Sequence, residues 1–197
     1  MLIGRGSVAR LATDLTNAGP DDHVVDVGCG PGGAARAAAR RGARISAVDP
    51  APVMLRLART VSRTRHGITW LEAAAEALPL PDESATILWS IATVHHWPDL
   101  DGGLAEAFRV LQPGGRLLAI ERRTRPGARG LASHGWTDHQ AESFAEHCRN
   151  AGFIDTRTET HRLRRQYQLA VLATRPGTPT RGAASGESPG VGPPDAS

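Results

Sequence analysis

The order of apolar and amphipathic segments is the feature that most constrains how this chain folds. Five short apolar runs that are typical of strands lie at 23–27, 43–48, 68–71, 85–91 and 116–121. Helical segments precede or separate them at 4–18, 34–41, 51–64 and 104–111. Repeated alternation of strands and helices predicts a parallel sheet with right-handed crossovers.

The C-terminal part adds a helix at 138–151 and two further strands, at 153–160 and 166–174. The link between these two strands, 161–165, is too short for a crossover, so the two strands must be antiparallel. The sequence therefore predicts an α/β fold. It is a Rossmann-like seven-stranded, mostly parallel sheet with an antiparallel last strand and helices on both faces.

A change in composition marks the expected end of the folded part. Residues 175–197 are rich in Gly, Pro, Ser and Thr, and Val191 is their only sizeable apolar residue. Such a segment buries too little apolar surface to offset its chain entropy. We therefore expect one domain over residues 1–174 and a disordered tail over residues 175–197.

Charge and cysteine content argue against a nucleic-acid-binding protein, a disulfide-rich protein and a zinc protein. All 23 basic residues are Arg and the formal charge is only +3, so a nucleic-acid partner is not indicated. Cys29 and Cys148 are too few for a disulfide framework or a zinc site. Neither a signal peptide nor a run of about 18 apolar residues is present, which predicts a cytoplasmic protein without a membrane anchor. The oligomeric state stays open.

A glycine-rich segment, Val24-Val-Asp-Val-Gly-Cys-Gly-Pro-Gly-Gly33, follows the first expected strand. Glycines at this point let the backbone approach a ligand closely and leave the next helix N-terminus accessible. Asp49 ends the second strand, where an acidic residue can accept both hydroxyls of a ribose. The spacing of Gly28, Gly30 and Gly33 also fits the dinucleotide pattern, so these residues alone leave NAD(P) open as the ligand.

Five segments, in this order, carry a more specific resemblance. They are Asp26-x-Gly-x-Gly-x-Gly32, Ala47-Val-Asp-Pro50, Ala75-Glu-Ala-Leu-Pro-Leu-Pro-Asp82, Val94-His-His-Trp-Pro-Asp99 and Val110-Leu-Gln-Pro-Gly-Gly-Arg-Leu-Leu118. Over about residues 5–174 the chain resembles the class I S-adenosyl-L-methionine (SAM)-dependent methyltransferases. The resemblance is to the methyltransferase domain 11 group, which includes ubiquinone/menaquinone methyltransferase-like enzymes. It implies a transferase that methylates an acceptor, here expected to be a small molecule.

The same resemblance implies the cofactor-binding residues. Gly28, Cys29 and Gly30 would pass beside the methionine part of SAM, and Asp26 would orient this loop and help to hold the amino group. Asp49 would hold the ribose hydroxyls. The remaining expected contacts are with the adenine and the methionine moiety, from Pro50, Ala75, Glu76, Ser90 and Ile91. Two departures from the family are Ala74, where an Asp is frequent, and Ala85-Thr86, where Phe-Asp is usual.

Catalytic residues are less defined. His95 and His96 follow the fourth strand, where open α/β sheets place their ligands, and either a general base or a pocket wall fits this position. No metal site is expected, because adjacent histidines should point in different directions and no third ligand is apparent. Glu121 fits a pocket carboxylate, although a solvated or capping role is the commoner one and is expected here. Trp136 fits a ring that stacks on the acceptor, although local packing is expected.

Three functions are compatible with the sequence. A methyltransferase is the main interpretation, an NAD(P)-binding oxidoreductase is the second, and a catalytically decayed SAM-binding protein is the third. The oxidoreductase would need a pair such as Tyr-x-x-x-Lys, and the chain has no Lys. A rim of arginines for an acidic acceptor is a further hypothesis, although a solvated charge run is the simpler explanation. These residues are Arg122, Arg123, Arg125, Arg129, Arg162, Arg164 and Arg165.

Overall fold

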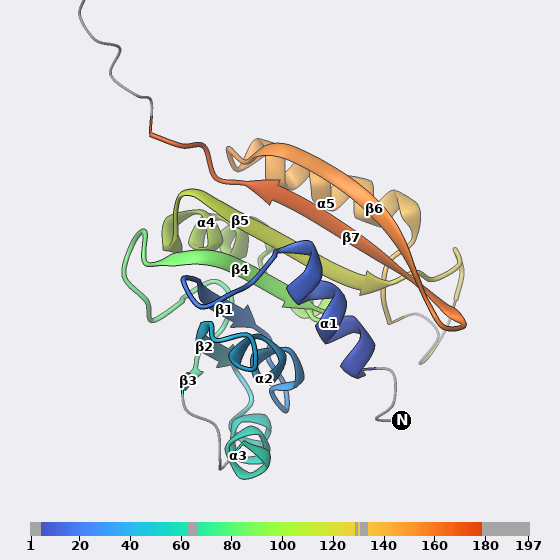
Figure 1. Cartoon of the computed structure of the whole chain (residues 1–197). Coiled ribbons are helices and arrows are strands. Elements are labelled where there is room, and N and C mark those ends of the chain that lie inside the picture. The colour runs from blue at the N-terminus through green and yellow to red at the C-terminus, as the bar shows by residue number, and fades with distance from the viewer. Residues whose placement is uncertain (1–4, 63–66, 129, 131–133, 179–197) are drawn as a thin grey trace, which may run out of the picture.

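The structure, a computed structural model, describes residues 5–62, 67–128, 130 and 134–178. Helices and strands alternate along the chain (Figure 1). The helices are α1 (Arg5–Leu15), α2 (Gly33–Ala39), α3 (Pro52–Val61), the short 3-10 helix η1 (Val94–His96), α4 (Leu100–Val110) and α5 (Asp138–Asn150). The strands are β1 (His23–Val27), β2 (Arg44–Asp49), β3 (Ile68–Glu72), β4 (Ala85–Ile91), β5 (Leu111–Arg122), β6 (Ile154–Leu163) and β7 (Gln166–Thr174).

These strands form one seven-stranded sheet in the order β3-β2-β1-β4-β5-β7-β6. The pairs among β1 to β5 are all parallel, and β7 is antiparallel to both β5 and β6. The predicted fold class is therefore confirmed. Because the strand order reverses between β1 and β4, the carboxyl ends of these two strands border the crevice in which such sheets bind their ligands.

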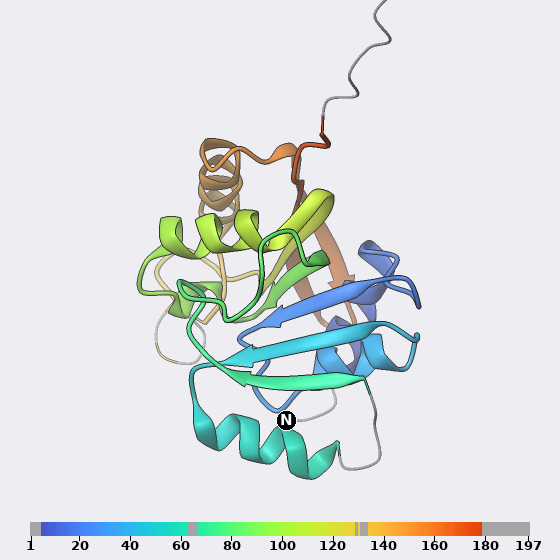
Figure 2. The same cartoon turned by 90° about the vertical axis from the view of Figure 1, so that its left-hand side faces the viewer.

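Helices cover both faces of the sheet and bury two apolar cores (Figure 2). On one face, α4 and α5 bury Leu104, Val110 and Phe144, and on the other, α1, α2 and α3 bury Ala12, Ala35 and Leu55. β4 runs between the two layers and its residues 87–90 are buried, as its mostly apolar sequence predicts. The central strands that reach the ligand edge are thus held rigidly from both sides.

Two strands differ from the expectation because of irregular backbone. β5 begins at Leu111 rather than Arg116, so Gln112–Gly115 is part of the strand, with a shift in its register against β4. In β6 the register shifts after Ile154, where Asp155 has a φ of 51°. The predicted alternation is broken, since Ile154, next to the bulge, is exposed whereas Thr156 is half-buried, and Thr160 is exposed as well.

The apolar stripe of α3 does not face the core. Val53, Leu57 and Val61 are 56%, 48% and 51% exposed, and only Leu55 and Ala58 of this helix are buried. The helix therefore packs on β2 and β3 through one narrow side.

Arg175, which directly follows β7, closes the sheet at the amino end of β5. Its backbone N–H donates to Gly115 O, and its carbonyl accepts from the Gly114 N–H. Its guanidinium donates to Leu111 O and pairs with Glu83 at 2.7 Å. The expected tail boundary at 174/175 stays a prediction, since residues 179–197 lie outside the described residues. No helix in the described ranges is long and apolar enough to cross a membrane.

Candidate functional site

The glycine loop between β1 and α2 is folded back over the end of β2. The Gly28 and Cys29 N–H groups both donate to Val48 O, at 2.8 and 2.9 Å. Gly28, Gly30 and Gly32 have positive φ values of 71°, 52° and 75°, which favour glycine. A Cβ at Gly28 would overlap the Thr93 side chain, and one at Gly32 would overlap the Trp70 ring. A Cβ at Gly30 would meet nothing within 4 Å, so this face of the loop is open.

Asp49 connects the loop to the end of β2. Its Oδ2 accepts the Gly30 N–H at 2.8 Å, and its Oδ1 accepts the Ala51 N–H at 2.9 Å. The residue is only 7% exposed. Because a carboxylate oxygen can accept two hydrogen bonds, each oxygen keeps capacity for one hydroxyl. Asp49 is thus fixed next to the open face of Gly30.

Asp26 lies under the same loop, in β1. It is 1% exposed, and its Oδ2 has no hydrogen-bond partner in the described part of the chain. Burial raises the pKa of Asp26 to about 7, and the nearby Asp49 adds to this rise. Trp89 and the Ala35 N–H oppose it. A buried carboxyl group with one oxygen lacking a partner is suited to receive a positively charged donor.

The other expected cofactor contacts lie around the same edge. Pro50 is exposed, Ala75 is buried, and Ile91 is half-buried. Ser90 is buried, and its hydroxyl lies 2.5 Å from that of Thr93. The Glu76 carboxylate accepts the Asp99 N–H at 3.2 Å, so one of its oxygens is already engaged.

The two departures from the family sit at different places. Thr86 lies near the amino end of β4, where its hydroxyl donates to Asp22 at 2.7 Å and accepts the His23 N–H. It is therefore at the opposite end of the strand from the glycine loop. Ala74 is half-buried in the segment after β3, beside the expected adenine contacts.

His95 forms a hydrogen-bonded pair with the buried Glu121. The His95 Nδ1 lies 3.0 Å from Glu121 Oε1, and the Glu121 side chain is fully buried. This bond raises the pKa of His95. The expectation that Glu121 is solvated or caps an element was wrong, because β5 places its last buried residue beneath η1.

The prediction that adjacent histidines diverge was also wrong. The His95 and His96 ring centroids are 4.0 Å apart, because the 3-10 turn of η1 brings both rings to one side. His134 contributes a third ring, 5.6 and 5.9 Å from the other two. Burial and the neighbouring His95 and His134 lower the pKa of His96. The potential ligand atoms of the three residues all lie within 4.8 Å of one another.

Two shallow cavities flank this histidine cluster. One, of about 320 Å³, is lined by His95 together with Val94, Trp97, Leu100, Trp136, Gln140, Ser143 and Phe144. The Trp136 ring packs on Phe144 with a centroid distance of 4.9 Å, so the expected local packing is present. The other cavity, of about 310 Å³, brings Arg122, Arg123 and Arg125 together with Arg165 and Tyr167. Arg123 is already paired with Asp138 at 2.5 Å.

Comparison with known proteins agrees with this geometry. Residues 25–119 match the methyltransferase domain family. The demethylmenaquinone methyltransferase of Tropheryma whipplei is 35% identical over 112 residues, which are 57% of this chain and 46% of that protein. The malonyl-[acyl-carrier protein] O-methyltransferase of Serratia marcescens is 39% identical over 99 residues, 50% of this chain and 38% of that protein. The chain thus matches less than half the length of these relatives.

A solved structure extends the similarity to most of the chain. A SAM-dependent methyltransferase from Aquifex aeolicus superposes with a TM-score of 0.71 at 18% identity, over 85% of this chain and 89% of that chain. At this identity the superposition supports the fold. Together with the family match, it confirms the resemblance expected from the five sequence motifs.

Sequence reasoning missed several contacts of the site. Thr93 packs on Gly28 and donates to Val27 O at 3.1 Å, and Trp70 covers Gly32. The pairing of Glu121 with His95 had one signal, an acidic residue ending an otherwise apolar strand. His134 was noted only for its place in the loop after the fifth expected strand, and its position beside η1 had no local signal because it depends on contacts distant in sequence.

Proposed function

We propose that this chain is a SAM-dependent methyltransferase that acts on a small-molecule acceptor. One observation carries the proposal. The Gly30 N–H is bonded to Asp49 at 2.8 Å while the outer face of Gly30 is open, so the glycine loop and the ribose-type acid form one site. The match of residues 25–119 to the methyltransferase domain supports it, since this segment contains the whole loop and Asp49.

The residues present fit SAM. The open face of Gly30 would receive the methionine part, and the free capacity of Asp49 would receive the ribose hydroxyls. The unpartnered Oδ2 of Asp26 is a place for the positive end of the amino acid moiety, held through the loop above it. SAM supplies a methyl group that its sulfonium already activates, so the protein has mainly to position the acceptor.

We propose that the acceptor binds in the cavity lined by His95, Trp97 and Trp136. This cavity is close to the carboxyl ends of β4 and β5, and its aromatic lining suits a flat or apolar small molecule. The named acceptors of the relatives, demethylmenaquinone and malonyl-[acyl-carrier protein], belong to those proteins. His95 lines the cavity and is the candidate to touch the acceptor, with Glu121 holding its ring.

The oxidoreductase alternative has less support. The chain has no Lys, and its only Tyr, Tyr167, is 46% exposed on β7 beside the arginine cavity. A decayed SAM-binding protein would keep the cofactor site and lack turnover. Only an assay of methyl transfer distinguishes such a protein from an active methyltransferase.

Calorimetry with SAM, S-adenosylhomocysteine and NAD tests the proposal. The chain should bind the first two and not the third. Gly30→Ala should weaken SAM binding by at least tenfold, because its methyl group would enter the open face of the loop. Gly33→Ala is the matched control, since Gly33 begins α2 and a Cβ there also meets nothing. NAD binding, or equal SAM affinity in both variants, would refute the proposed site.

A further inference from the structure

Three imidazole rings converge at the carboxyl ends of β4 and β5. His95 and His96 come from η1, and His134 comes from the loop that follows β5. We propose that His95, His96 and His134 form a binding site for a divalent transition-metal ion such as Zn²⁺, in which Glu121 is a positioning residue. The metal site stands on this geometry. Any role of the ion in methyl transfer rests on the proposed function.

The separation of the ligand atoms is compatible with this site. Tetrahedral Zn²⁺ with Zn–N bonds of about 2.0–2.1 Å requires nitrogens about 3.3 Å apart. The three candidate nitrogens already lie within 4.8 Å of one another. Because His96 and His134 are exposed, small rotations of their side chains can close the remaining gap.

Glu121 prepares His95 for binding an ion. The neutral imidazole has one N–H, and the bond between Nδ1 and the carboxylate at 3.0 Å places this hydrogen on Nδ1. The Nε2 lone pair is then available on the side away from Glu121. Metal-binding histidines are commonly held in this way by a carboxylate that fixes the ring and its tautomer.

The backbone around His134 is held by defined contacts. The Arg122 guanidinium donates to the His134 carbonyl at 2.9 and 3.2 Å, and the Trp136 N–H donates to Arg122 O at 2.9 Å. Gly135 between them has a φ of 129°, and a Cβ there would overlap the Arg122 carbonyl. The loop therefore fixes the position of His134 relative to η1. The Arg122 guanidinium is a positive charge close to the proposed metal site. The negative charge of the buried Glu121 carboxylate offsets its repulsion of a metal ion.

The chemistry of the donors selects the class of ion. Imidazole nitrogen suits Zn²⁺, Cu²⁺, Ni²⁺ and Co²⁺ better than Mg²⁺ or Ca²⁺, which prefer oxygen. Three protein ligands leave a fourth position for water or substrate, as in zinc sites of catalytic type. Because His95 also lines the 320 Å³ cavity, that fourth position borders the space in which we place the acceptor.

Titration with Co²⁺ tests the site by visible absorption, with Zn²⁺ added afterwards as a competitor. The chain is used in full length and without a histidine tag. One Co²⁺ per chain should bind, and Zn²⁺ should displace it. His96→Ala and His134→Ala should each lower the affinity at least tenfold. Glu121→Gln should lower it about 10- to 100-fold, because the His95 ring loses its anionic partner.

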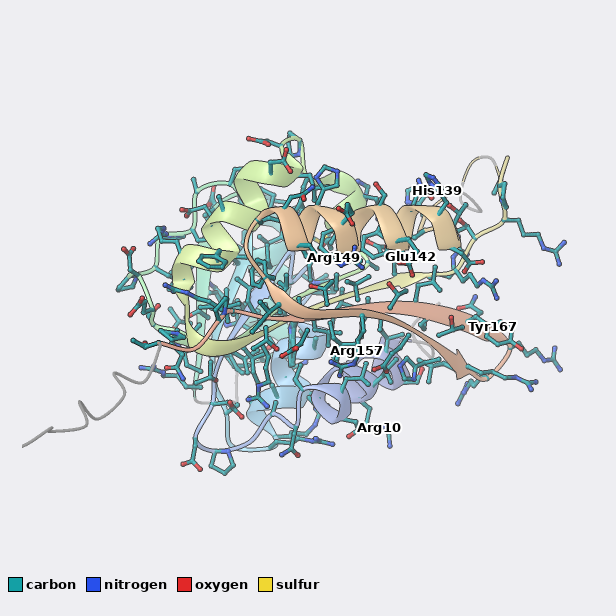
Figure 3. All side chains as sticks on the ribbon, turned by 90° about the horizontal axis from the view of Figure 1, so that it is seen from above. Arg10, His139, Glu142, Arg149, Arg157 and Tyr167 are labelled. Carbon is teal, nitrogen blue, oxygen red and sulfur yellow. The ribbon has the colours of Figure 1, made fainter. Side chains whose placement is uncertain are left out.

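His139→Ala is the matched control. His139 is an exposed histidine at the start of α5 (Figure 3). It is five residues after His134 and does not belong to the cluster of three. Its removal should leave Co²⁺ affinity unchanged. Parental affinity in His134→Ala, or an equal loss in His139→Ala, would overturn the proposal. Because His134 is exposed, its variant should fold even if Glu121→Gln does not.

SAM calorimetry on the same proteins separates the two proposals. Metal binding through the cluster in a chain that binds no SAM would refute the proposed function and support the metal site. SAM binding in a chain that takes up no Co²⁺ or Zn²⁺ would overturn the metal site alone.

Discussion

The buried carboxyl group of Asp26 should make the stability of this protein fall as the pH rises. Its pKa is raised from 3.8 to about 7, mainly by burial. A group whose pKa is higher in the folded state contributes stability that is complete below its unfolded pKa. This contribution is lost as the pH rises through the folded value. Between pH 5 and pH 8, these two pKa values correspond to a loss of roughly 2.5 kcal/mol in unfolding free energy.

The perturbation that isolates this loss is Asp26→Asn, measured without SAM. The variant has no carboxyl group to ionise at this position, so its stability should lack that contribution. The difference in melting temperature between variant and parent should therefore shift in favour of the variant by roughly 5–10 °C from pH 5 to pH 8. The other titrating groups are present in both proteins and cancel in this difference.

The assay follows melting temperature and urea unfolding of both proteins at half-unit pH steps. Only the change with pH is interpreted, because the Asn amide adds two donors and shifts the curve by a constant amount. Parallel curves for the two proteins would refute the reasoning. They would mean that Asp26 is ionised throughout this range and is held by a donor in the fold.

Three further predictions concern the site and the contacts of Arg175. Asp49→Ala should weaken SAM binding by about 2–4 kcal/mol in calorimetry, since it removes charge-assisted bonds to two hydroxyls; parental affinity would remove Asp49 from the site. Ala74→Asp should tighten SAM binding by about 0.5–1.5 kcal/mol, because it adds an acceptor for the adenine amino group where one oxygen of Glu76 is already engaged with the Asp99 N–H. Glu76→Gln should then change little, and the opposite pair of results would assign the adenine contact to Glu76. Arg175→Ala should lower the unfolding free energy by about 1–2 kcal/mol in urea, whereas deletion of residues 176–197 should leave it unchanged. Equal losses in the two would show that the stabilising contacts extend beyond Arg175.

The parallel part of the fold was predictable because its signals are local. The apolar runs that became β1 and β4 have the predicted bounds, and the short link between β6 and β7 forced them to be antiparallel. The bulge at Asp155 and the long β5 were missed, since register shifts depend on the neighbouring strand. Val53, Leu57 and Val61 on α3 have helical spacing, but no other element of the described residues covers them. The periodicity therefore predicted the helix and not the burial of this face.

The candidate site also has one part that local motifs predict and another part that they do not. Gly28 and Gly30 carry motif information, and the structure places them beside Asp49 at one edge, although their role toward SAM stays a proposal. The cluster of His95 and His134 could not be predicted, because 38 intervening positions, β5 and a loop separate the two residues. Their meeting depends on the length of β5 and on the contacts of Arg122, which no local pattern encodes.

The position of β7 has a consequence for how this molecule is assembled. β5 pairs with β4 on one side and with β7 on the other, and β7 is the last strand among the described residues. Until that strand arrives, β5 has an unpaired edge that is long and largely apolar, which favours aggregation. β6 and β7, in contrast, are joined by a short turn and can pair with each other early. We expect this hairpin to dock on β5 as a preformed unit, so that a chain truncated before residue 154 would retain the glycine loop and yet accumulate as an insoluble species.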